Sequence, residues 1–472
     1  MAEKAPVILW FRRDLRTVDH AALTAAVETG RPVVPVFVLD PQTEAIGAAP
    51  KYRLGLSLAA LADDLSALGL RLVLRRGPAL DILRGLVAET GAGAVYWSRL
   101  YDPQAKERDT AVKAGLKADG LDVRSFAGHV LFEPWTVATQ TGGFYRVFTP
   151  MWKAVRSRAL GACLPAPKAV RPPEVRPASE ALDDWQMGAA MRRGAQVMRP
   201  YCTVGQAAAR ARLDRFIAER VHKYQDTRDL PAVDGTSRLS ENLTYGEISP
   251  LQCWHAGWQA MQAGAGQAEV FLKELVWREF AYHLVHHTPH IIDQNWKPDW
   301  DQFKWNETDI PEVLAWKQGR TGIPFVDAAM REMYVTGTMH NRGRMIVASY
   351  LTKHLLTHWK VGQAWFADCL TDWDPASNAM GWQWSAGSGP DATPYFRVFN
   401  PESQLEKFDK AHLYADRWIA EGKRQPTATA LSYFDAIPKN WEMSAGASYP
   451  APIMPVDLGR KRALEAYADR GF

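Results

Sequence analysis

The stretch VVPVFVLD (residues 33–40) is a short, uninterrupted apolar run that ends in an aspartate. A run of this length, rich in β-branched residues, is typical of a strand buried on both faces. Comparable runs are VILWF (7–11), RLVLRRG (71–77), AVYWSRL (94–100) and LDVRSFAG (121–128). Ala- and Leu-rich stretches with helical spacing, such as ALDILRGLVAET, lie between them. The alternation predicts an α/β domain over residues 1–130, built on a doubly wound, parallel five-stranded sheet.

The first predicted strand is followed by FRRDLRTVDH, not by a glycine-rich turn. The usual dinucleotide-binding fingerprint is therefore missing, and this half is not predicted to bind NAD. Arg12, Arg13 and Arg16 in this segment are compatible with a solvated loop or with ion pairs inside the domain.

The chain changes character after this domain. Residues 164–178 read LPAPKAVRPPEVRPA, and the repeated prolines predict an extended connector within an interdomain linker over residues 131–200. Beyond it, stretches such as AEVFLKELVWREFAYHLVHH repeat apolar residues with a period of 3.6. Residues 201–472 are therefore predicted to form a predominantly α-helical domain.

Composition limits the function classes. No run of 18 apolar residues occurs, so no membrane helix is expected, and the first apolar run is too short for a signal peptide. We therefore expect a cytoplasmic protein. A net charge of +4 permits an anionic partner without demanding one. The four scattered cysteines are expected to be free thiols.

Tryptophan is unusually frequent, and 14 of the 19 lie at or after Trp254. The stretch ASNAMGWQWSAGSG (376–389) places two of these rings one residue apart among small residues. Core packing explains a single buried tryptophan. Two large rings with small neighbours also leave room for flat ligands.

KELVWREF (273–280) puts Glu274, Trp277 and Arg278 on one stripe of a helix. An ordinary Glu274–Arg278 helix pair with Trp277 in the core would explain the pattern equally well. In MHNRGRMIVASY (339–350), Asn341, Arg344 and Met345 share a stripe. These residues are compatible with capping and surface charge, or with the wall of a pocket for a flat, polar-edged ring.

Three further segments carry weak signals by themselves. Asp372 and Asp374 precede a proline, which is often turn chemistry. GTSRLS (235–240) could bind phosphate through its amides and hydroxyls, or simply cap a helix. HLVHHTPH (283–290) is a poor candidate for a metal site, and no metal is predicted.

In combination, WFRRDLR, TSRLS, ELVWREF, HNRGRM, DWDPASNAMGWQW and PYFRVFNP resemble, in this order, the photolyase/cryptochrome flavoprotein family. The resemblance covers essentially the whole chain and is strongest to photolyases that repair cyclobutane pyrimidine dimers. It implies a carbon–carbon lyase, a deoxyribodipyrimidine photo-lyase, that binds a U-shaped FAD in the helical domain. The implied cofactor contacts are Tyr224, Thr236, Ser237, Arg238, Leu239, Ser240, Arg278, Asn341, Arg344, Asp372, Asp374 and Asn378. Among these, Asn378 would lie at flavin N5, and Arg344 would pair with Asp372.

The resemblance also implies a DNA substrate whose pyrimidine dimer is flipped out of the duplex. The implied pocket residues are Glu274, Trp277, Asn341, Arg342, Met345, Trp384 and Arg397. Trp382, Trp359 and Trp305 match a relay that carries an electron from the surface to the flavin. The two rings of GWQW would thus serve different partners, Trp382 the flavin and Trp384 the DNA.

The implied reaction is light-driven. Excited FADH− donates an electron to the dimer, the cyclobutane bonds split and the electron returns. Family members also carry an antenna, either methenyltetrahydrofolate or 8-hydroxydeazaflavin, and a monomer is expected. Two alternatives remain: a cryptochrome-type blue-light receptor, and, without the family, a nucleotide-binding α/β protein joined to a helical interaction module.

Overall fold

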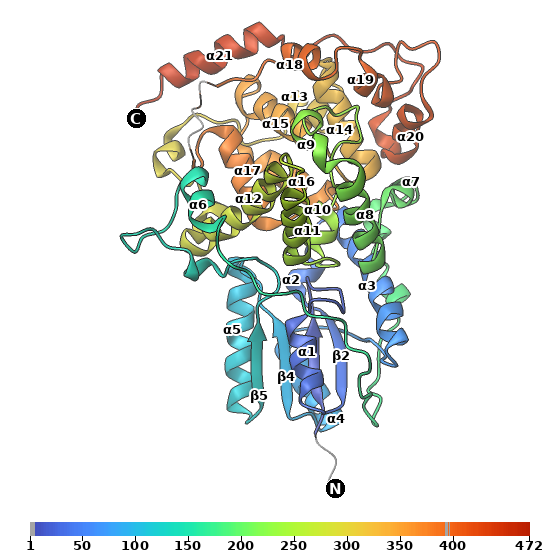
Figure 1. The fold of residues 1–472 in the computed structure, drawn as a ribbon. Helices are drawn as coiled ribbons and strands as arrows, with labels where there is room; N and C mark the ends of the chain where they lie inside the picture. Colours follow the sequence, from blue (N-terminus) through green and yellow to red (C-terminus); the bar gives the residue numbers. More distant parts are fainter. Residues whose placement is uncertain (1–4, 392–394, 396) are drawn as a thin grey trace.

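A parallel sheet forms the N-terminal half of the chain, in a computed structural model that describes residues 5–391, 395 and 397–472 (Figure 1). Its strands are β1 (Val7–Phe11), β2 (Val33–Leu39), β3 (Val73–Arg76), β4 (Ala94–Ser98) and β5 (Asp122–Phe126). They pair in the order β3-β2-β1-β4-β5, and every pairing is parallel. The predicted five-stranded sheet is confirmed.

Helices cover both faces of the sheet, and β1 and β2 are therefore buried on both sides. The odd-numbered side chains of β1 pack toward α1 (Ala21–Glu28) and α3 (Ala48–Ala67). Its even-numbered side chains pack toward α4 (Ala79–Thr90) and α5 (Pro103–Ala118). A short helix, α2 (Pro41–Glu44), follows β2. The sheet is therefore the middle of three layers, as the continuous apolar runs predict.

The loop after β1 is largely buried and is therefore not a solvated loop. Arg16 is 1% exposed and donates to the carbonyl oxygens of Asp19, Gly128 and Gly246, at 2.9, 3.0 and 2.9 Å for the nearest nitrogens. Arg12 is also buried and forms an ion pair with Asp109 on α5. The ion-pair interpretation is correct for Arg12, whereas Arg16 attaches the loop to the helical half.

The connecting region holds little regular structure. Helix α6 (Phe148–Val155) packs into an apolar cluster of the helical half, and residues 156–181 contain no helix or strand. Short helices follow, including α7 (Gly194–Met198). The proline-rich segment 164–178 thus has the irregular conformation expected of a connector, because its prolines cannot donate the hydrogen bonds of a helix. The boundaries at residues 130 and 200 stay predictions.

The rest of the chain is helical, as expected, and stands above the carboxyl edge of the sheet in Figure 1. Its helices surround two apolar clusters, one centred on α12 and the other on α14 to α17. No helix in the described part of the chain has the length and apolarity needed to cross a bilayer. Beyond α7 the α-helices are α8 (Gln206–Glu219), α9 (Tyr224–Thr227), α10 (Ser240–Thr244), α11 (Pro250–Gln262), α12 (Ala268–His287), α13 (Pro311–Lys317), α14 (Pro324–Thr336), α15 (Asn341–Ser349), α16 (Trp359–Cys369), α17 (Pro375–Ala386), α18 (Pro401–Phe408), α19 (Leu413–Trp418), α20 (Ala428–Ala436) and α21 (Val456–Ala468).

Candidate functional site

Helix α17 has one buried face and one open face. It begins at Asp374, whose carboxylate caps the Ser377 amide at 2.8 Å, and it ends at Gly387 with φ +91°. Asn378, Gly381 and Trp384 lie on the accessible side. A Cβ added to Gly381 would meet no heavy atom of the described residues within 4 Å. The buried side holds Ala376, Ala379, Trp382, Gln383 and Ala386.

Helices α12 and α15 both pack against α17 and carry the other predicted pocket residues. On α12, Trp277 is half-buried and stacks on Phe148 of α6, with ring centroids 3.8 Å apart and planes 4° apart. On α15, Asn341 is exposed and Met345 half-buried, with 4.0 Å between the Asn341 amide nitrogen and the Met345 sulfur. The three packed helices therefore carry flat and polar side chains that are at least partly exposed.

The interpretation of Glu274 and Arg278 as an ion pair within one helix is wrong. Glu274 forms its ion pair with Arg228, which follows α9 directly. Arg278 instead donates to the carbonyl oxygen of His129 at 2.7 Å, and the two side chains meet at 3.0 Å. Glu274, Trp277 and Arg278 do share one side of α12, but the two charged residues bind partners from neighbouring segments. Their long side chains reach the segments that pack beside the helix.

A buried chain of hydrogen bonds leads from Arg278 to the start of α17. His129 contacts the Tyr282 hydroxyl at 2.8 Å, and that hydroxyl donates to Asp374. Burial lowers the pKa of His129 well below its ordinary value, and the nearby Arg278 lowers it further. His129 is therefore neutral at pH 7. The chain orients Asp374, a predicted cofactor residue, by way of a tyrosine and a histidine that the sequence motifs did not single out.

Arg344 and Asp372 form the ion pair that the sequence analysis expects. The guanidinium donates to both carboxylate oxygens, at 2.9 and 2.7 Å, and Nε donates to the Met339 carbonyl. Asp372 is buried, whereas the Arg344 side chain is 28% exposed. The pair therefore holds the Arg344 guanidinium in a fixed place at a partly exposed position.

Two predicted DNA contacts have other partners in the structure. Arg342 forms an ion pair with Asp229 at 2.8 Å and lies 4.3 Å above the Phe408 ring. A phosphate would have to share or replace Asp229. Arg397 is exposed, and its carbonyl oxygen accepts from the buried Lys353 at 2.7 Å.

The segment 236–240 is a loop that enters α10 at Ser240. Arg238 adopts φ +52° and pairs with Asp234 at 2.9 Å, so its side chain points along the loop rather than away from it. The loop borders a cavity of about 370 Å³, and Tyr224 is buried nearby, against Phe216 and Phe271. The cavity is lined by Thr203, Ala208, Ala211, Arg212, Arg215, Arg220, Asp234, Ser237 and Arg238. Its four guanidinium groups against a single carboxylate make it suitable for an anion.

The three relay tryptophans lie along the path from α17 outward. Trp382 is 2% exposed, and its ring lies directly over Gly362 of α16, where a Cβ would approach it to 2.0 Å. Trp359 starts α16 one turn before Gly362 and donates to Asn295 at 2.8 Å. The His358 ring lies between Trp359 and the half-buried Trp305, at 5.3 and 5.6 Å. The sequence analysis did not identify His358.

The histidines of residues 283–290 pack with aromatic rings. His283 accepts from the Tyr145 amide at 3.0 Å, and His287 stacks on Phe144 at 5.0 Å. Within the described ranges, no group of three His, Cys, Asp or Glu side chains is arranged to hold a metal ion.

Comparison with known proteins accounts for this geometry. Residues 7–173 match the family model for DNA photolyase, and residues 271–469 match that for the FAD binding domain of DNA photolyase. The chain is 46% identical over 470 residues to a deoxyribodipyrimidine photo-lyase of Agrobacterium fabrum, covering 98% of both sequences. This chain belongs to the DNA photolyase family.

Other relatives of this chain include both photolyases and cryptochromes. A crystal structure of a class III photolyase from Agrobacterium tumefaciens superimposes with a TM-score of 0.91 at 44% identity, covering 99% of this chain and 98% of that one. Cryptochrome-1 of Arabidopsis thaliana is 33% identical over 97% of this chain and 70% of its own length. The DNA photolyase family therefore includes both photolyases and cryptochromes that resemble this protein.

The match to the FAD binding domain covers most of α12 and all of α15 and α17. The residues present fit a flavin on two observations. Gly381 leaves open space on a helix face beside the Asn378 amide, and the arginine-lined cavity meets the loop 236–240. A flat ring system and a diphosphate need these two kinds of surface.

Proposed function

We propose that this protein repairs cyclobutane pyrimidine dimers in DNA under blue or near-UV light. The observation that carries the proposal is the packing of α12 and α15 against α17. The predicted lesion contacts Glu274, Trp277, Asn341, Met345 and Trp384 are all at least partly exposed on these three helices, and α17 also carries the partly exposed Asn378.

FAD, when bound and reduced, supplies the light-excited electron donor for this chemistry. The chain provides binding and orientation. Asn378 donates its amide nitrogen to the Gln363 carbonyl at 3.1 Å and would present its side-chain oxygen to the ring edge. The Arg344 guanidinium, held by Asp372, would lie beside the ring. Trp382, one turn beyond Asn378 on α17, is buried against Gly362 of α16, the helix that begins at Trp359.

The lesion would be held by flat walls and a few polar groups. Trp277 has one ring face against Phe148, which fixes its plane, and Trp384 is half-buried at the far end of the open face. Glu274 and Asn341 can bind the polar edges of the pyrimidines. Photolyases are an established class of base-flipping enzymes, and extruding a nucleotide from the duplex costs a few kcal/mol, least for a damaged base.

Cryptochrome-type blue-light reception is the second candidate, favoured by the 33% identity to cryptochrome-1 over nearly the whole chain. The two functions share a fold and a flavin and differ in turnover. An antenna, methenyltetrahydrofolate or 8-hydroxydeazaflavin, belongs to the proposal for either function. A near-UV absorption band beyond those of FAD in the purified protein would identify it.

The deciding experiment counts cyclobutane dimers in UV-irradiated DNA after incubation with the purified protein, its flavin chemically reduced, in light and in darkness. We expect loss of dimers only in light. Glu274→Ala should lower repair about tenfold or more while FAD stays bound, because it removes a charge-assisted contact to the lesion. Glu269→Ala is the matched control, since the Glu269 side chain, among the described residues, pairs with Lys273 on the same helix at a half-buried position. Equal dimer counts in light and darkness would favour the receptor.

A further inference from the structure

A buried cluster of charged side chains joins the two halves of the chain beside the loop 236–240. Arg53 of α3 is fully buried and binds both carboxylate oxygens of Glu247, at 3.0 and 2.8 Å. Its Nε lies 3.9 Å from Glu241, the second residue of α10. Arg212 of α8 approaches Glu241 from the other side, at 3.6 Å. Two arginines therefore balance two buried carboxylates, and only Arg212 is partly exposed.

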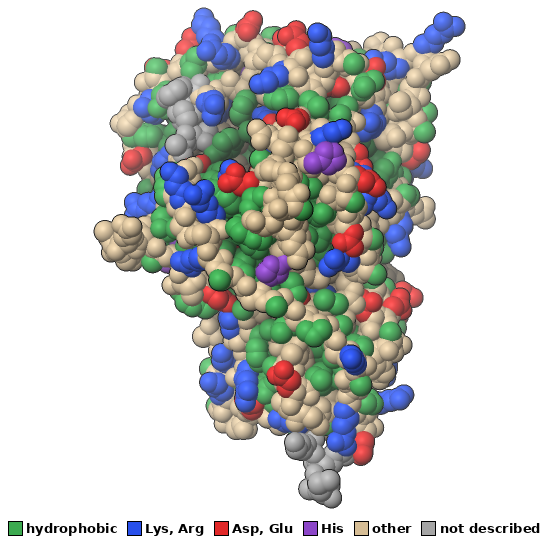
Figure 2. Space-filling view, in the orientation of Figure 1, with side chains coloured by type: hydrophobic (Ala, Val, Ile, Leu, Met, Phe, Trp, Pro, Cys, Tyr) green, Lys and Arg blue, Asp and Glu red, His purple; other side chains and the backbone are tan. Residues whose placement is uncertain are grey.

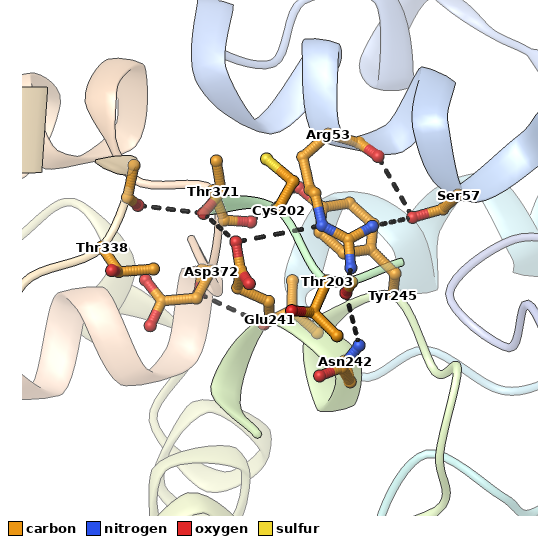
Figure 3. Close-up of polar contacts among 12 residues, drawn as sticks. Arg53, Ser57, Cys202, Thr203, Glu241, Asn242, Tyr245, Thr338, Thr371 and Asp372 are labelled. Carbon is orange, nitrogen blue, oxygen red and sulfur yellow. Dashed lines mark hydrogen bonds and ion pairs between the residues drawn. The ribbon is translucent and has the colours of Figure 1, made fainter. Parts of the chain in front are cut away.

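Glu241 also forms a hydrogen bond with a segment that lies far away in the sequence. Its carboxylate accepts from the Thr371 hydroxyl, which is itself fully buried. The residue before Glu241 ends the loop 236–240, and the residue after Thr371 is Asp372, the partner of Arg344. Figure 3 shows Glu241 between Arg53 and Thr371, with Asp372 beside them. One side chain thus connects the loop suited to phosphate with the ion pair suited to the flavin ring.

The surrounding hydrogen bonds leave this connection little freedom. The Tyr245 hydroxyl lies 2.9 Å from the Pro50 carbonyl oxygen and 2.7 Å from that of Thr371, and its one proton is shared between them. Thr244 donates to the Asp372 carbonyl at 3.1 Å. Helix α10 is therefore tied to α3 on one side and to residues 371–372 on the other. Burial raises the pKa of Glu241, and the Arg53 charge opposes that rise, so Arg53 favours the ionised acceptor.

We propose that Glu241 is a positioning residue for FAD: through Thr371 it holds the loop 236–240 and the Asp372–Arg344 pair at the spacing a folded-back flavin needs. Arg53 lies on α3 and neutralises the carboxylates of Glu241 and Glu247, so the α/β domain also contributes to this positioning. Flavin affinity would then depend on a contact outside the flavin pocket. The proposal rests on FAD binding and not on dimer repair, so a receptor function would leave it intact.

The test measures the dissociation constant of oxidised FAD in the dark, by flavin fluorescence, on the full chain. Thr371→Val removes the hydroxyl at constant shape and leaves the buried carboxylate without this donor. We expect the dissociation constant to rise about ten- to hundredfold, as for loss of a hydrogen bond to a buried charge. Thr371→Ser keeps the hydroxyl and should restore affinity to within about threefold. Glu241→Gln, which keeps an acceptor but no charge, should lie between them.

A matched control separates positioning from general stability. Arg331 and Glu421 form another buried ion pair, at 2.6 Å, that contacts neither the loop 236–240 nor residues 371–372 among the described residues. Glu421→Gln should lower the unfolding midpoint of the apoprotein without changing FAD affinity. If Thr371→Val binds FAD as tightly as the Thr371→Ser and Glu421→Gln variants, the cluster is only structural and the proposal is overturned. Weaker binding by Thr371→Val alone supports it, whether or not dimers are repaired.

Discussion

Trp382 lies in the apolar core of the helical half, yet its indole nitrogen has no hydrogen-bond partner among the described residues. Phenylalanine at this position therefore breaks no such bond and removes only ring volume. The role that the family resemblance implies for Trp382 is that of an electron donor to the flavin.

We expect Trp382→Phe to abolish light-driven reduction of oxidised FAD, because the first donor of the relay is gone. Repair by enzyme whose flavin has been reduced chemically should remain within about threefold of wild type. Absorption spectroscopy during illumination follows reduction, and dimer counting follows repair. Trp418→Phe is the control, since Trp418 is buried in the same cluster and its indole nitrogen is likewise unpartnered among the described residues. Loss of repair together with photoreduction in Trp382→Phe would contradict the separate role.

Glu279 is a buried carboxyl group at the contact between α12 and the connecting region. It accepts from the amides of Leu131 and Phe132, at 2.6 and 3.1 Å. Burial raises its pKa to about 7, although Arg278 and the two amides act in the opposite direction. Between its ordinary pKa and about 7, the folded protein therefore binds a proton that the unfolded chain releases.

The stability contributed by this proton is complete below the ordinary pKa of a glutamate and is lost as the pH rises through about 7. We expect the free energy of unfolding of wild type, relative to Glu279→Gln, to fall by roughly 2–3 kcal/mol between about pH 5 and pH 8. Urea titrations of both proteins across this range measure the difference. A difference that stays constant with pH would mean that Glu279 is ionised throughout.

At the scale of elements, α16 and α17 pack closely at the point where a glycine of α16 faces a tryptophan ring of α17. Gly362 has no Cβ, and Trp382 occupies the space that one would fill. Gly381, on the other face of α17, has open space in front of it. The two glycines thus have opposite meanings: one permits close packing of two helices, and the other leaves room beside Asn378.

Alanine at each position distinguishes these meanings. Gly362→Ala should displace the Trp382 ring, lower stability by about 1–3 kcal/mol and slow light-driven flavin reduction. Gly381→Ala should stabilise the apoprotein by about 0.5–1 kcal/mol, because alanine favours a helix, while weakening FAD binding. Thermal unfolding of apoprotein and FAD titration provide both numbers. Tighter FAD binding by Gly381→Ala would show that the flavin does not lie against this face.

For the whole molecule, the distribution of charge decides how DNA can bind. Figure 2 shows Lys and Arg side chains spread over both halves among Asp and Glu, in keeping with a net charge of +4. On the face that this view shows, a duplex would therefore meet separate arginines rather than a uniformly basic surface. Arg342 is the arginine that we propose for this contact, and its ion pair with Asp229 would compete with a phosphate.

We expect affinity for UV-damaged DNA to fall linearly on a log–log plot against salt concentration. Arg342→Ala should weaken binding and reduce the slope by about 0.9, the effect of losing one phosphate contact. Asp229→Asn should do the reverse, since it frees Arg342 for phosphate. Fluorescence anisotropy at several salt concentrations gives the slopes. The same change of affinity in both variants would exclude competition between Asp229 and phosphate.

The sequence by itself determined the class and order of the elements. Continuous apolar runs specify buried parallel strands, and a 3.6-residue period specifies helices, because both patterns are local. Motif order was enough to identify the family, and the Arg344–Asp372 pair followed from it. Only the tertiary structure decided which partners the other charged residues have. Glu274 binds Arg228, Arg278 binds His129, and Arg16 joins the two halves of the chain. These partners lie far apart in sequence, and packing, not periodicity, brings them within the few ångströms over which a hydrogen bond forms.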